Sequence, residues 1–313
     1  MIEVRNLTKD YGPRRAINQL NFTINKGEVV GFLGPNGAGK STTMKIITGF
    51  MAPTSGKAVV GGFDVFENPI EVKKRIGYLP EIPPVYSDMR VRDYLQYVAE
   101  LKGVSREKIE KNVSNSIEKA QLGSVEKRMI HNLSKGFRQR VGIAQALVSD
   151  PEVLILDEPT VGLDPKQVAE IRELIQQLRG HHTIILSTHI LPEVQATCER
   201  IIIINKGQIV AQDTLSNLAN LKSGTRKVSL KLKRPGAEIA RDLSSIQGVM
   251  QVNTGGSSQD WLLDTQESDE VIERIATAVI QKGYGLLEIS SARADLEDIF
   301  LKLTYGKQNE VEA

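Results

Sequence analysis

The segment best suited to chemistry is a glycine-rich loop that ends in a lysine and two hydroxyl side chains. Its glycines, Gly37 and Gly39 among them, let the backbone direct successive N–H groups toward phosphate oxygens at the start of a helix. Lys40 can neutralise the β- and γ-phosphates, and Ser41 can bind Mg²⁺. The loop predicts a nucleotide site, with a turn merely rich in glycine as the alternative. Its residues are Gly34, Pro35, Asn36, Gly37, Ala38, Gly39, Lys40, Ser41 and Thr42.

Two adjacent carboxylates form the second group able to do chemistry. Asp157 and Glu158 follow the aliphatic run Val153–Leu156. Asp157 is suited to hold Mg²⁺, directly or through water, and Glu158 is suited to orient or deprotonate an attacking water. A buried strand followed by a turn that only caps a helix is the alternative. Together with the phosphate loop, the pair indicates a nucleoside triphosphatase.

Short aliphatic strands must position both groups. Val29–Leu33 leads into the glycine-rich loop, which continues into a helical pattern beginning at Thr43. Val153–Leu156 leads into the two carboxylates, and Thr183–Leu186 is a third strand of this kind. Short, mostly apolar strands that alternate with helices are typical of a buried, mainly parallel sheet. We therefore expect an α/β core that brings the carboxylates beside the phosphate loop.

A third segment lies between these two groups. It runs from Leu133 to Arg140 and contains Ser134 and Gly136. Here the sequence resembles the ATP-binding cassette (ABC) ATPases, whose signature loop is usually Leu-Ser-Gly-Gly-Gln. The resemblance implies that Ser134 and Gly136 cap an ATP molecule held by the phosphate loop of a second, facing subunit. Lys135 replaces a glycine of the usual signature and Phe137 replaces the glutamine. A plain helix N-cap at Ser134 is the alternative.

Four more positions match the family in sequence order. The resemblance implies that Tyr11 stacks on adenine, although it could be a tyrosine in an exposed turn. Glu81 stands where the family usually has a glutamine that senses Mg²⁺ and the γ-phosphate. The resemblance also implies that Asp164 belongs to a loop that crosses the dimer interface. His189 is implied to contact the γ-phosphate, whereas a lone histidine after a strand would usually be structural.

The resemblance covers about residues 2–220 and implies a P-loop NTPase of the ABC type. Lys40, Glu158 and His189 would then be catalytic, ATP and Mg²⁺ the cofactors, and Ser41, Glu81 and Asp157 the metal-binding residues. Two copies of the chain would form a homodimer that powers separate transmembrane permease subunits, docked near residues 82–97. The subgroup that it resembles is the ABC-2-type exporter ATPases. A soluble ABC ATPase of the translation or DNA-repair type, and a binding module without catalysis, are the alternatives.

The composition of the chain argues against some other classes of protein. Lys and Arg total 40 against 38 Asp and Glu, so the net charge of +2 gives no reason to expect a nucleic-acid partner. The longest aliphatic runs, such as Ile201–Ile204, are far shorter than the roughly 20 residues that span a bilayer. The single cysteine, Cys198, suits a reducing compartment. We expect a soluble chain in the cytoplasm, peripheral on the cytoplasmic face of the membrane.

The sequence also predicts two domains. Residues 1–221 would form the ATPase, with an inserted helical subdomain at about 87–150, where Val91, Tyr94, Leu95, Val98 and Leu101 recur at helical spacing. Residues 225–305 would form an accessory or regulatory domain, and the polar tail 306–313 would be disordered. We expect the second domain to be a ferredoxin-like α+β sandwich. Its expected elements are Lys227–Leu232 (strand), Ile239–Ile246 (helix), Val249–Asn253 and Asp260–Asp264 (strands), Val271–Gln281 (helix), Leu286–Ile289 (strand) and a last helical segment, Leu296–Leu303.

Overall fold

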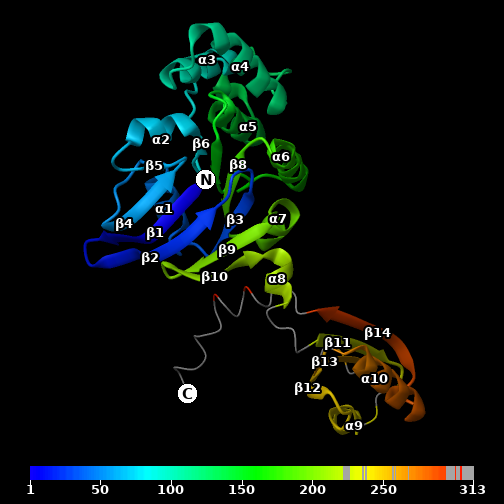
Figure 1. Ribbon diagram of the computed structural model, residues 1–313. Coiled ribbons are helices and arrows are strands. Elements are labelled where there is room, and N and C mark those ends of the chain that lie inside the picture. Colours follow the sequence, from blue (N-terminus) through cyan, green and yellow to red (C-terminus); the bar gives the residue numbers. More distant parts are fainter. Residues whose placement is uncertain are drawn as a thin grey trace. The chain divides into compact units, whose positions relative to one another are not determined.

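The computed structural model describes residues 1–220, 226–234, 236, 238–255, 257, 259–266, 268–293, 300 and 304. The chain divides into two compact units, Met1–Asp213 and Thr214–Ala313 (Figure 1). Most of the helical segment predicted at Leu296–Leu303, and all of the polar tail 306–313, lie outside the described residues. No helix among the residues just given is long and apolar enough to cross a membrane.

A six-stranded sheet forms the centre of the first unit. β3 pairs in parallel with β8 and β9, and β7 pairs in parallel with β6 and β8. Every residue of β3, β7 and β8 is buried, which explains why these strands are aliphatic along most of their length. The strand order is β10 (Gln208–Thr214), β9 (Arg200–Asn205), β3 (Val29–Leu33), β8 (Thr183–Thr188), β7 (Val153–Asp157) and β6 (Ile76–Leu79).

The register of this sheet brings three strand ends together. Leu33 at the end of β3 lies opposite Thr188 of β8, and Asp157 at the end of β7 lies opposite Ser187. The chain after each strand therefore leaves from the same edge of the sheet. Along the chain, α1 (Lys40–Ile47) follows β3, α6 (Pro165–Leu178) follows β7 and α7 (Leu191–Thr197) follows β8 (Figure 1).

An antiparallel sheet completes the α/β core. β1 (Ile2–Tyr11) pairs with β2 (Arg14–Ile24) and with β4 (Ser55–Val60), which also pairs with β5 (Phe63–Asp64). Tyr11 ends β1 and lies opposite Arg14 at the hairpin turn. Buried side chains of this sheet and of one face of the six-stranded sheet form one hydrophobic core. Tyr11 therefore belongs to the same compact unit as the ends of β3, β7 and β8.

The helical part has a core of its own. α3 (Val91–Leu101), α4 (Arg106–Lys119) and α5 (Lys135–Leu147) bury one shared apolar cluster. α2 (Pro69–Arg75) precedes α3 along the chain, and the short 3₁₀ helix Ile130–Asn132 lies between α4 and α5. Four residues of the predicted helical pattern are buried, but the fifth, Leu101, is exposed. Leu101 is the last residue of α3, and the chain turns away at Gly103, so its side chain lies beyond the shared core.

The second unit is the predicted α+β sandwich. Its four strands are all paired antiparallel, and their order is that of a ferredoxin-like sheet. The strands and helices predicted between Lys227 and Ile289 are present, and the last of these strands is longer than expected. Helix α8 (Leu215–Asn220) precedes β11 (Arg226–Leu232), α9 (Ile239–Ser244), β12 (Val249–Thr254), β13 (Asp260–Thr265), α10 (Asp269–Gln281) and β14 (Leu286–Arg293).

A buried histidine at the start of β8 predicts a pH-dependent stability. The His182 ring is buried, and its Nδ1–H donates to the Pro151 carbonyl oxygen at 2.7 Å. Burial lowers the pKa of His182 below 6.5, although the bond to Pro151 opposes this shift. The unfolded chain therefore takes up a proton near pH 6.5, and the folded chain does so only at lower pH. The free energy of unfolding should fall as pH decreases below about 6.5.

Replacing His182 with asparagine should reduce this dependence, because the amide can still donate to Pro151 but does not titrate. Chemical denaturation at several pH values between about 7.5 and about 5 measures the free energy of unfolding across this titration. His181→Asn, at the exposed neighbouring position, is the control and should keep the wild-type dependence. Equal slopes in all three proteins would show that His182 does not contribute.

Candidate functional site

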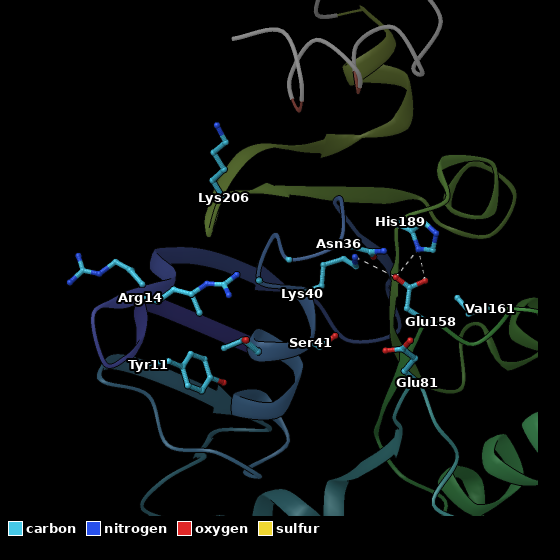
Figure 2. Close-up of a pocket in the computed structure, with 15 residues that line it drawn as sticks. Tyr11, Arg14, Asn36, Lys40, Ser41, Glu81, Glu158, Val161, His189 and Lys206 are labelled. Carbon is cyan, nitrogen blue, oxygen red and sulfur yellow. Dashed lines mark hydrogen bonds and ion pairs between the residues drawn. The ribbon is translucent and has the colours of Figure 1, made fainter. Parts of the chain in front are cut away.

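A pocket of about 810 Å³ lies at the edge where the three strands end (Figure 2). It is formed by the hairpin after β1, the glycine-rich loop, and the segments after β6, β7 and β8. The pocket therefore gathers predicted residues from five separate stretches of the chain. Its lining consists of Tyr11, Arg14, Arg15, Ala16, Asn36, Gly37, Gly39, Lys40, Ser41, Thr42, Glu81, Glu158, Val161, His189 and Lys206.

The glycine-rich loop depends on its glycines at three positions. Gly37 and Gly39 have φ angles of 78° and 111°, in the left-handed region that favours glycine. A Cβ at Gly34 would lie 2.3 Å from the carbonyl oxygen of Ile204, so no larger residue fits there. The loop then enters α1 at Lys40. Its backbone is therefore fixed against β9 and turned as a phosphate-binding loop requires.

Lys40 lies at the centre of the pocket. Its side chain is 5% exposed, and its Nζ donates to the Gly34 carbonyl oxygen at 2.8 Å. The same Nζ lies 3.3 Å from Oε1 of Glu158, whose side chain is 6% exposed (Figure 2). Because attraction between charges is strong where water is excluded, this pair holds the glycine-rich loop to the segment after β7.

Glu158 also contacts the residue after β8. The Nδ1 of His189 lies 3.0 Å from both carboxylate oxygens of Glu158. A carboxylate only accepts, so Nδ1 carries the proton and Nε2 is left to face a ligand. Glu158 has a φ angle of 50°, which is uncommon for a residue with a side chain, and its backbone N–H donates to the Ser187 carbonyl at 2.8 Å. Lys40, Glu158 and His189 thus form one connected group.

Asp157 lies deeper, beneath this group. It is 2% exposed and accepts hydrogen bonds from the hydroxyls of Ser187, at 2.7 Å, and Ser41. Burial raises the pKa of Asp157 above its ordinary value, although both hydrogen bonds act in the other direction.

The Ser41 and Asp157 pair fits Mg²⁺. Among the described residues no three His, Cys, Asp or Glu side chains gather as a metal site. Mg²⁺ usually keeps several waters and takes one or two protein oxygens together with phosphate oxygens, so a hydroxyl and a carboxylate in contact are a suitable donor set. Glu81 lines the same pocket and can supply a further oxygen.

Ser134, Gly136 and Asp164 do not line this pocket. Ser134 is the N-cap of α5, where its Oγ accepts from the N–H of Phe137 at 3.4 Å. Asp164 is the N-cap of α6 and accepts from the N–H of Gln167 at 2.9 Å. The two capping loops are neighbours, because a Cβ at Gly136 would lie 2.6 Å from the Gln167 side chain. We call this group, Ser134, Gly136 and Asp164, the capping surface.

Three basic residues in the lining were not predicted. Arg14 and Arg15 begin β2, directly after the turn of the β1–β2 hairpin, and Arg15 forms an ion pair with Asp10 at 2.8 Å. Their closeness in sequence to Tyr11, the predicted adenine-stacking residue, could have indicated that these two arginines line the nucleotide site. Lys206 lies after β9, and it reaches the site only because β9 pairs with β3. No local pattern around Lys206 indicates this.

The fold and the pocket together define a P-loop nucleoside triphosphatase. Residues 17–161 match the family model described as ABC transporter. The bacitracin transport ATP-binding protein BcrA of Bacillus licheniformis is 30% identical over 98% of both chains. The lantibiotic transport ATP-binding protein SrtF of Streptococcus pyogenes is 39% identical and covers 71% of this chain and 94% of its own. The chain belongs to the ABC transporter family.

A solved structure agrees with this assignment. The dimeric ABC transporter cassette MJ0796 has a TM-score of 0.63 and 26% identity, and it covers 69% of this chain and 99% of its own. A second structure of that cassette, with the same figures, is a post-hydrolysis state with bound ADP and phosphate. The predicted family, fold class and ATPase activity are confirmed. The relatives are ATP-binding subunits of transporters, which supports the predicted transport function and not the soluble alternative.

Proposed function

We propose that this chain is the ATPase subunit of an ABC-2-type exporter and that two copies complete each ATP site. One observation carries this proposal. The pocket of a single chain gathers Lys40, Glu158 and His189, whereas the capping surface lies outside it. Two chains arranged head to tail would bring the capping surface of each over the phosphate loop of the other. Each chain would then contribute to both sites of a homodimer.

In this arrangement each side of the pocket has its own task. Tyr11 would stack on adenine, with Lys9 over the ring at 5.6 Å from its centroid. The loop of residues 34–42 would hold the phosphates, and Ser41, Asp157 and Glu81 would hold Mg²⁺, which neutralises charge on the phosphate oxygens. Glu158 would orient or deprotonate the attacking water, while Nε2 of His189 faces the γ-phosphate.

The ion pair between Lys40 and Glu158 supports a switch. A phosphate at the loop would compete with the Glu158 carboxylate for Nζ of Lys40, because both are anions within reach of one cation. Binding would thereby release Glu158 toward the water that it activates. Capping by the second copy depends on the γ-phosphate, so hydrolysis would favour the open form.

Relatives support export as the direction of transport. Besides the two transport proteins above, the linearmycin resistance ATP-binding protein LnrL of Bacillus subtilis is 30% identical over 97% of this chain and 98% of its own. Moving a compound out of the cell is one way in which a transporter can confer resistance to it. We infer an antibiotic-like compound as the class of cargo for the transporter that this chain energises.

Separate permease subunits would dock on an exposed apolar surface near residues 82–97. Ile82 is 82% exposed, and the rings of Tyr86 and Tyr97 pack at a tilt with their centroids 5.7 Å apart. Tyr94 fixes the loop that runs from Ile82 to Tyr86, because its hydroxyl donates to the Pro84 carbonyl oxygen at 2.9 Å. Exposed apolar side chains in a group mark a contact surface. Docking there would hold the chain at the cytoplasmic face of the membrane.

Co-purification from membranes tests this proposal. The wild-type chain should be recovered from detergent-solubilised membranes with a hydrophobic permease. Replacing Ile82 and Tyr97 together with serine should reduce this recovery about tenfold or more, since buried aromatic and aliphatic contacts carry most of the energy of an interface. ATP binding should be unchanged, because neither residue lines the pocket.

Ile280→Ser is the matched control, since Ile280 is also exposed but lies in the second unit. It should co-purify as the wild type does. Recovery with ribosomes or DNA instead of a membrane protein would contradict the assignment to a transporter. Equal recovery of the double variant and the wild type would contradict this docking surface.

A further inference from the structure

Glu193 is a buried carboxylate outside the pocket described above. It lies on α7 and is 2% exposed. Both of its side-chain hydrogen bonds within the described part of the chain come from neutral hydroxyls, those of Thr160 and Thr188. A carboxylate is costly to bury, and an apolar residue would fill the same space more cheaply. The position therefore calls for a reason beyond packing.

Its two partners lie beside the reacting groups. Thr188 is 2.9 Å from Oε2 of Glu193 and immediately precedes His189. Thr160 contacts the other carboxylate oxygen and lies two residues after Glu158, at the start of the segment that leads to Asp164. Both threonines are buried. One carboxylate thus joins the chain that carries His189 to the chain that carries Glu158.

The helix that carries Glu193 is held firmly against a third part of the site. Val194 packs on Gly31 of β3 so closely that a Cβ at Gly31 would lie 2.4 Å from its Cγ1. β3 leads directly into the glycine-rich loop. α7 therefore rests on the strand that leads into the phosphate loop, and from there Glu193 contacts the other two segments through Thr160 and Thr188.

We propose that Glu193 is a positioning residue for ATP hydrolysis, which rests on the roles proposed above for Glu158 and His189. It bridges the hydroxyls of Thr160 and Thr188, and so fixes the distance between the Glu158 carboxylate and the His189 ring. The same bridge anchors the segment leading to Asp164. A movement of the segment between Thr160 and Asp164 at the dimer interface would therefore change the positions of Glu158 and His189, because Thr160 and Glu193 connect them.

Steady-state kinetics on the full chain test this role. Glu193→Ala should lower kcat about tenfold to a hundredfold, as loss of a supporting hydrogen-bonding group commonly does. KM for ATP and the affinity for a fluorescent ATP analogue should change less than about twofold, because Glu193 does not line the pocket. Glu193→Gln keeps the shape and at least one hydrogen bond, so its kcat should lie between those of the wild type and Glu193→Ala. Gln195→Ala, on the exposed side of α7, should behave as the wild type.

Removing a hydroxyl gives an independent test that leaves Glu193 in place. Thr160→Val and Thr188→Val should each lower kcat with little change in KM. Adding Thr160→Val to Glu193→Ala should lower kcat by less than the product of the two separate effects, because both changes break the same bond. If Glu193→Ala does not fold, the two valine variants carry the test alone.

The inference would be overturned if folded Glu193→Ala, or both valine variants, hydrolysed ATP with wild-type kcat. Loss of ATP affinity in proportion to the loss of kcat would also overturn it, since that pattern indicates a general loss of structure. Wild-type turnover by Glu158→Gln would instead contradict the proposed function. The two failures can therefore be told apart.

Discussion

Replacing Lys40 with alanine should weaken MgATP binding about tenfold to a hundredfold or more, because charge-assisted hydrogen bonds to phosphate contribute roughly 1.5–3 kcal/mol. Lys40 is the cation at the centre of the pocket, and it is buried on the helix that follows the glycine-rich loop. Titration with a fluorescent ATP analogue measures the change in Kd. Lys45→Ala, which removes a lysine from the same helix outside the pocket, should bind MgATP as the wild type does.

One side effect of this substitution must be separated from binding. Lys40→Ala leaves the Glu158 carboxylate buried without its cation, which costs stability. The double variant Lys40→Ala with Glu158→Gln removes both charges and should recover thermal stability. Its affinity for MgATP should remain as low as that of Lys40→Ala, because the lysine is still missing. Normal MgATP affinity in either folded variant would refute the proposed role of Lys40.

Replacing Glu158 with glutamine should lower kcat about a hundredfold to ten-thousandfold, the usual contribution of a general base. The amide keeps the shape of the side chain and its contact with His189, but it cannot accept a proton from water. MgATP affinity should be retained or increased, because Lys40 no longer has a competing carboxylate.

Phosphate release under saturating MgATP measures kcat. Glu173→Gln, an exposed glutamate on α6, is the matched control and should hydrolyse ATP at the wild-type rate. If Glu158→Gln also hydrolysed ATP at that rate, Glu158 would not be the base. The neighbouring carboxylate, Asp157, would then be the next candidate.

Much of the fold could be predicted because burial leaves a clear pattern in the sequence. β3 and β7 are buried along their whole length, and each reads as an aliphatic run that ends at the chemistry. In the second unit, β11 alternates buried and exposed residues, as a sheet covered on one face requires. Leu101 continues the helical spacing and lies in α3 as that spacing predicts, but it is exposed, because periodicity alone does not show where a helix leaves its core.

The site was less predictable where residues meet through sheet order and not through spacing. The proximity of Lys40, Glu158 and His189 follows from parallel strands that end at one edge. Lys206 reaches the pocket only through the pairing of β9 with β3. Glu193 could not be found from the sequence, because its partners lie at the end of β8 and after β7, and its helix packs on a third strand, β3.

The most direct test of the composite site is the mass of Glu158→Gln in solution, measured by multi-angle light scattering with and without MgATP. We expect 34.5 kDa without nucleotide and a shift toward twice that mass with MgATP. The double variant with Lys40→Ala should stay at 34.5 kDa under both conditions. A Glu158→Gln protein that binds MgATP and remains at 34.5 kDa would contradict a site completed by a second copy.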